Sequence, residues 1–110
     1  MPMHEKRVRD RIPEIIATEG IRAECRVLDD AEYIARLEAK LDEELAEYRS
    51  SGDRDELADI VEVIEAILAR QGTSWETFEA MRRAKRDARG GFTRRLLLRS
   101  MTPSSVEPAD

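Results

Sequence analysis

The apolar residues of this chain recur mainly at helical spacing, in segments separated by glycines and by residues that commonly cap helices. Residues 31–48 carry apolar side chains three or four positions apart, and residues 54–70 repeat the pattern. This period predicts amphipathic helices. Residues 13–19 predict a shorter helix, since a proline suits a first turn and a glycine follows. Residues 73–89 predict a fourth helix, which a Gly-Gly pair ends.

Two short segments lack the helical period. Residues 23–28 alternate polar with apolar side chains and predict a short β-strand. Residues 92–99 predict a second strand, and the two could pair. Residues 100–110 are a polar Pro/Ser segment, expected to be a disordered tail. We therefore expect a mainly α fold: one domain over 1–99, a bundle of about four helices with a small two-stranded β element.

The composition supports a small helical domain with a thin core. The chain has 110 residues, of which 41% are hydrophobic, 5% aromatic and 39% charged. A core this thin is often stabilised by oligomerisation, so a homodimer or higher oligomer is expected. The single cysteine, Cys25, excludes an internal disulfide and favours a reducing cytoplasm. No apolar run reaches membrane-spanning length, and the first ten residues lack the apolar stretch of a signal peptide.

Charge is strongly segregated along the chain. The net charge is −5, but residues 29–65 carry −10 and residues 82–99 carry +7. Such segregation indicates either solvated faces or an ionic ligand with two kinds of contact. The acidic region argues against a broad nucleic-acid surface.

Four acidic residues fall on or beside the apolar stripes of the two longest predicted helices. They form two pairs spaced i, i+3, namely Glu44 with Glu47 and Glu56 with Asp59. Buried carboxylates are costly unless they are paired or bind a metal. Packing the two stripes together as antiparallel neighbours would bring all four carboxylates to one edge of the interface. The sequence therefore predicts a cation site, although acidic pairs at this spacing are also common on solvated helix faces.

The donor set selects the kind of cation. All-oxygen ligands favour Mg²⁺, Mn²⁺ or Ca²⁺. The chain has no EF-hand loop and no cluster of Cys and His, its lone histidine being His4. These observations argue against a zinc or iron centre and favour Mg²⁺, with Mn²⁺ as a substitute.

The basic region offers candidate phosphate ligands. Lys85 and Arg89 are spaced i, i+4 on one face, just before a Gly-Gly break. An Arg fork and a Lys point charge could hold phosphate oxygens. Cations at a helix C-terminus also interact favourably with the helix dipole, which is a sufficient structural reason for some of them.

The sequence resembles the MazG-like, all-α nucleoside triphosphate pyrophosphohydrolases, which include phosphoribosyl-ATP pyrophosphohydrolase and dimeric dUTPases. The family pattern EExxE followed by ExxD reads here as residues 43–47 and 56–59, with a short gap that requires a tight loop. A small phosphoribosyl-ATP pyrophosphohydrolase-like subgroup is similar over most of residues 7–98. The matching segments are RVRDRIPEII, RVLDDAEY, KLDEELAE, ELADIVEVIEAI and KRDARGGFTRRLLL.

The resemblance implies a Mg²⁺-dependent enzyme that cleaves a nucleoside triphosphate between its α- and β-phosphates, giving a nucleoside monophosphate and pyrophosphate. Such an enzyme could clear non-standard or excess nucleotides. The implied cation ligands are Glu44, Glu47, Glu56 and Asp59. Glu43 or Glu44 would position or deprotonate the attacking water.

The resemblance also implies contacts to the substrate and between subunits. The far phosphates would be held by Lys85 and Arg89, with Arg9 and Lys6 as weaker candidates. Family sites are built at interfaces of dimers or higher oligomers. The base and sugar stay open. The alternatives are a non-catalytic helical dimer that serves as a scaffold, and a binding module that uses the basic region.

Overall fold

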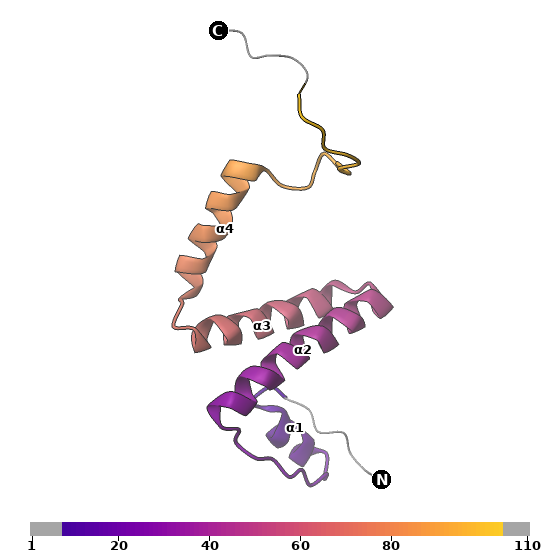
Figure 1. The fold of residues 1–110 in the computed structure, drawn as a ribbon. Helices are drawn as coiled ribbons and strands as arrows, with labels where there is room; N and C mark the ends of the chain where they lie inside the picture. Colours follow the sequence, from indigo (N-terminus) through magenta and orange to yellow (C-terminus); the bar gives the residue numbers. More distant parts are fainter. Residues whose placement is uncertain (1–7, 105–110) are drawn as a thin grey trace. The chain divides into compact units, whose positions relative to one another are not determined.

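The computed structural model describes residues 8–104 and is mainly helical (Figure 1). Its four helices are α1 (Ile12–Thr18), α2 (Asp30–Ser51), α3 (Arg54–Arg70) and α4 (Trp75–Arg89). The predicted all-α class and the four predicted helices are confirmed. The chain divides into two compact units whose boundary lies between Phe78 and Glu79, within α4. Within residues 8–104, none of the helices is both long enough and apolar enough to cross a lipid bilayer.

Helices α2 and α3 pack side by side as an antiparallel hairpin (Figure 1). Gly52 ends α2 in the left-handed conformation, with φ 67°, and its N–H donates to the carbonyl of Tyr48 at 2.7 Å. Asp53 then caps α3, its carboxylate accepting from the N–H of Asp55 at 3.1 Å. A left-handed glycine followed at once by a capping aspartate reverses the chain within two residues. The tight loop predicted between the two helices is present.

The core of the first unit lies between these two helices. Leu37 on α2 and Val63 and Leu68 on α3 are its buried apolar residues. Glu44 is buried among the same helices, with only 5% of its surface exposed. Leu45 on α2 is apolar but exposed. The buried stripe is therefore narrow and includes a carboxylate.

The segment before α2 is fixed by local polar contacts. Pro13 occupies the first turn of α1, and Gly20 follows that helix with φ 76°. Asp29 caps α2 by accepting a hydrogen bond from the N–H of Glu32 at 2.9 Å. The guanidinium of Arg26 donates to both carboxylate oxygens of Glu32, at 3.0 and 2.7 Å. This two-pronged pair joins the irregular segment to the first turn of α2.

The two predicted strands are wrong: residues 23–28 and 92–99 are both irregular, and residues 8–104 contain no strand. Val27 and Phe92 are 94% and 97% exposed, so neither segment buries an apolar face. Arg95 has φ 59° and its N–H donates to the carbonyl of Phe92, which places a turn inside the second segment. Without a packed face, an isolated two-stranded ribbon is at best marginally stable.

The second unit comprises most of α4 and the segment that follows it. Ser74 caps α4 by accepting from the N–H of Thr77 at 3.1 Å, and Gly90 follows the helix with φ 81°. Residues 100–104 of the predicted tail are irregular and exposed. Residues 105–110, the rest of that tail, lie outside the described part of the chain.

Candidate metal centre

The four acidic residues of the two predicted pairs come together near the turn of the α2–α3 hairpin. Glu44 and Glu47 lie on the last turns of α2, and Glu56 and Asp59 lie on the first turns of α3. Because only two residues join the helices, these turns lie opposite each other. One carboxylate oxygen from each of Glu44, Glu56 and Asp59 lies within 4.8 Å of the other two. We call this group the inter-helix triad.

A second triad overlaps with the first. Glu43, Glu44 and Glu47 also each offer an oxygen within 4.8 Å of the others, and we call this group the α2 triad. Glu44 belongs to both. Glu47 also lies close enough to Glu56 for its charge to raise the pKa of Glu56, so the two groups are neighbours. The five carboxylates therefore form one continuous acidic cluster.

Two oxygens of the cluster are buried without a hydrogen-bond partner. They are Oε2 of Glu44 and Oε2 of Glu56, and both residues belong to the inter-helix triad. Burying a carboxylate oxygen without a partner is unfavourable, so natural proteins usually pair such groups or use them as metal ligands. These oxygens therefore fit the donor set of a hard divalent cation.

The protonation of Glu56 reflects the same crowding. Burial, followed by the charges of Glu47, Asp59 and Glu44, raises the pKa of Glu56 above its usual 4.5. Like charges and low solvation both disfavour the carboxylate form. A cation placed among these carboxylates would reverse that preference, because it binds the deprotonated form.

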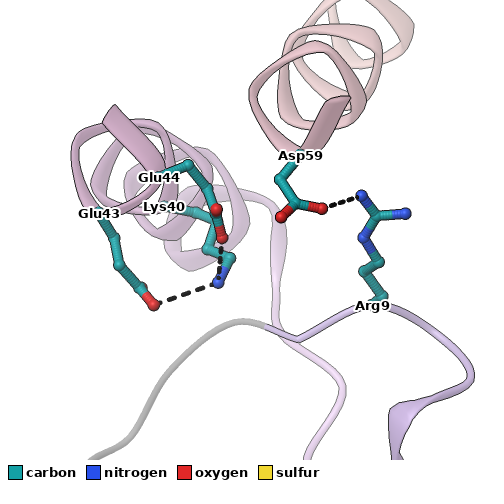
Figure 2. A network of polar contacts seen from close by, with 5 residues as sticks. All are labelled: Arg9, Lys40, Glu43, Glu44 and Asp59. Carbon is teal, nitrogen blue, oxygen red and sulfur yellow. Dashed lines mark hydrogen bonds and ion pairs between the residues drawn. The ribbon is translucent and has the colours of Figure 1, made fainter. Parts of the chain in front are cut away.

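Lys40 supplies a cation that the sequence analysis did not identify. Its ammonium lies 2.9 Å from Oε1 of Glu44 and 3.2 Å from Oε1 of Glu43 (Figure 2). Burial disfavours the charge on Lys40, but its bonds to the two carboxylates outweigh burial and hold its pKa above 10.5. The signal was available in the sequence: Lys40 precedes Glu44 by four residues and so shares its helix face.

Arg9 reaches the other side of the cluster. Its Nη2 lies 2.6 Å from Oδ1 of Asp59 (Figure 2), across 50 positions of sequence. The structure thus brings Arg9 to the predicted metal ligands. Lys85 and Arg89 are exposed on the C-terminal part of α4, in the second unit. Lys6, the remaining candidate for phosphate contact, lies outside the described residues.

Comparison with known proteins adds one relative. No family model matches the chain, and no solved structure matches it. The chain is similar to an uncharacterized protein of Mycolicibacterium smegmatis, with 56% identity over 48 residues. The match covers 44% of this chain and 49% of that protein, so the chain spans about half the length of the curated relative that it matches.

Proposed function

We propose that this protein is a Mg²⁺-dependent nucleoside triphosphate pyrophosphohydrolase, which yields a nucleoside monophosphate and pyrophosphate. The main support is the pair of buried, unpartnered oxygens, Oε2 of Glu44 and Oε2 of Glu56, within one triad. Carboxylates held on two packed helices are the hard donors that Mg²⁺ and Mn²⁺ prefer. The resemblance of the EExxE and ExxD segments to MazG-like enzymes connects this donor set to triphosphate hydrolysis.

Different residues of the cluster have different proposed roles. The inter-helix triad would hold the cation, with Glu47 beside it as a weaker donor. When bound, Mg²⁺ neutralises phosphate charge and lowers the pKa of a water molecule. Glu43 or Glu44 orients the attacking water and accepts its proton. Arg9, already beside Asp59, offers its guanidinium fork to a phosphate oxygen.

The proposal extends to the second unit and to assembly. Lys85 and Arg89, one helical turn apart and exposed, are the proposed ligands of the far phosphates. We also propose a homodimer or higher oligomer. The exposed apolar side chains of Leu45, Leu57 and Val61 on the hairpin support this assembly.

Pyrophosphate release from a panel of NTPs and dNTPs, with and without MgCl₂, tests the activity. At least one nucleotide should be turned over, and Glu44→Gln and Asp59→Asn should each lower the rate by about 100-fold or more. Glu62→Gln removes an exposed acid of α3 outside the two triads and should leave the rate unchanged. The proposal would be contradicted if no nucleotide of the panel were hydrolysed, or if Glu44→Gln and Asp59→Asn hydrolysed them at the wild-type rate.

A further inference from the structure

The two triads differ in whether they already contain a cation. In the α2 triad, the Lys40 ammonium bonds to Glu44 and Glu43, and its side chain is only 17% exposed. Lys40 and Glu44 lie one turn apart on the same rigid helix, so the ammonium is held close to this position. The α2 triad is therefore neutralised in part from within the fold.

Of the three residues of the inter-helix triad, Lys40 bonds to the shared Glu44 alone, through Oε1. Its Glu44 is 5% exposed, and Oε2 of Glu44 and Oε2 of Glu56 have no partner. Arg9 also bonds to this triad, through Asp59, and the side chains of both residues are exposed. The two buried oxygens without a partner therefore both belong to residues of this triad.

The charge of the cluster favours one divalent cation rather than two. Five carboxylates against Lys40 and Arg9 leave a formal charge of −3. One bound divalent cation changes this formal charge to −1. A second would change it to +1 in the absence of a bound phosphate. Because Mg–O bonds are only about 2.1 Å long, a second cation on Glu43 and Glu44 would also lie very close to the Lys40 ammonium.

We propose that Lys40 is a built-in counter-ion that occupies the place of a second metal ion, so that the protein alone holds one divalent cation, in the inter-helix triad. Lys40 acts as a positioning residue. By binding Oε1 of Glu44 it leaves Oε2 without an internal partner and available to a cation. The inference rests on the proposed function only in requiring that the cluster binds a divalent cation.

Counting bound Mn²⁺ tests this directly, by electron paramagnetic resonance of free Mn²⁺ combined with calorimetric titration. The wild-type protein should bind one Mn²⁺ per chain. Lys40→Met keeps the length of the side chain without its charge, and Lys40→Gln keeps a hydrogen-bond donor without the charge. Both should bind two. Lys40→Arg keeps the charge, and Arg49→Met removes an exposed charge elsewhere on α2. Both controls should bind one.

Two further variants locate the wild-type ion. Glu56→Gln should weaken Mn²⁺ binding by about 100-fold or more, whereas Glu47→Gln should weaken it by less than about tenfold.

One Mn²⁺ in both Lys40→Met and Lys40→Gln would overturn the counter-ion inference and leave the metal centre intact. Two Mn²⁺ in the wild type, or equal losses in Glu56→Gln and Glu47→Gln, would also overturn it. No Mn²⁺ in the wild type would remove the metal centre itself. Binding of one Mn²⁺ without nucleotide turnover would contradict only the proposed activity.

Discussion

The carboxylate of Glu44 is divided between two environments. Its Oε1 accepts a bond from Lys40 at 2.9 Å, while its Oε2 is buried without a partner. A carboxylate that served only to neutralise the lysine could have been left at the surface, where such pairs cost little. Its burial therefore points to a further positive partner for Oε2.

Arg9 is predicted to compete with the metal ion for Asp59. An exposed ion pair of this kind is worth up to about 1 kcal/mol, so Arg9→Gln should tighten Mn²⁺ binding by about twofold to fivefold. The same variant should raise KM for the nucleotide, because the guanidinium also serves as the proposed phosphate contact. Calorimetry measures the Kd for Mn²⁺, and steady-state kinetics measures the KM for the nucleotide. Weaker Mn²⁺ binding in Arg9→Gln would contradict the competition.

The acidic residues of the site were predictable. Lys40 was overlooked although its four-residue spacing from Glu44 was visible, and Arg9 was expected only as a weaker phosphate contact. Glu44 and Glu56 stood out because they interrupt apolar stripes. Lys40 does not interrupt any pattern, since a lysine between apolar positions is ordinary in a helix. The pairing of Arg9 with Asp59 joins residues 50 positions apart, and no local spacing encodes such a contact.

The turn between α2 and α3 fixes the register of the acidic cluster. A Cβ added to Gly52 would meet nothing within 4 Å, so only its left-handed φ of 67° opposes substitution. Gly52→Ala should therefore lower the free energy of unfolding by about 1–2 kcal/mol. Gly52→Asn should cost less, because asparagine tolerates this conformation better. Urea unfolding measures both. An equal cost for the two variants would show that φ is not the cause.

The pair between Arg26 and Glu32 gives the start of α2 a defined pH dependence. The hydrogen bonds from Arg26 lower the pKa of Glu32 from 4.5 to about 2. Because the folded-state pKa is depressed, the pair contributes stability above pH 4.5 and loses it as the pH falls toward 2. Arg26→Gln should therefore be less stable than the wild type at pH 7, and the difference should shrink between pH 4.5 and 3.

Urea unfolding at pH 7, 4.5 and 3 measures that difference. Arg22→Gln is the matched control, since it removes an exposed arginine from the same segment before α2. It should show no such convergence with the wild type. A stability difference for Arg26→Gln that stays constant from pH 7 to pH 3 would contradict the assigned role of the pair.

The helices were predictable because their sequence signals are local. The errors arose in segments whose secondary structure depends on packing against other parts of the molecule. Apolar period and capping residues identified α1 to α4. Helix α2 continues past Tyr48 to Ser51. The sequence pattern ended at residue 48 because the residues that follow are polar and carry no periodic signal. The strands at 23–28 and 92–99 failed because a short alternation becomes a strand only when a partner covers its apolar face.

The protein as a whole combines a thin core with an acidic cluster at its best-packed element. Few side chains of residues 8–104 are buried, and one of them is Glu44. A cation that binds only the folded hairpin would stabilise it by mass action, by about 2.7 kcal/mol at a hundred times its Kd. Metal binding and folding of the hairpin are therefore expected to be coupled.

The reaction proposed for this cluster is hydrolysis of a nucleoside triphosphate between its α- and β-phosphates. The most direct measurement is ³¹P NMR of the products formed from each nucleotide in the presence of Mg²⁺. The products should be a nucleoside monophosphate and pyrophosphate in equal amounts, with no reaction when EDTA removes the metal. A nucleoside diphosphate with inorganic phosphate as products, or no product from any nucleotide, would contradict the proposed reaction.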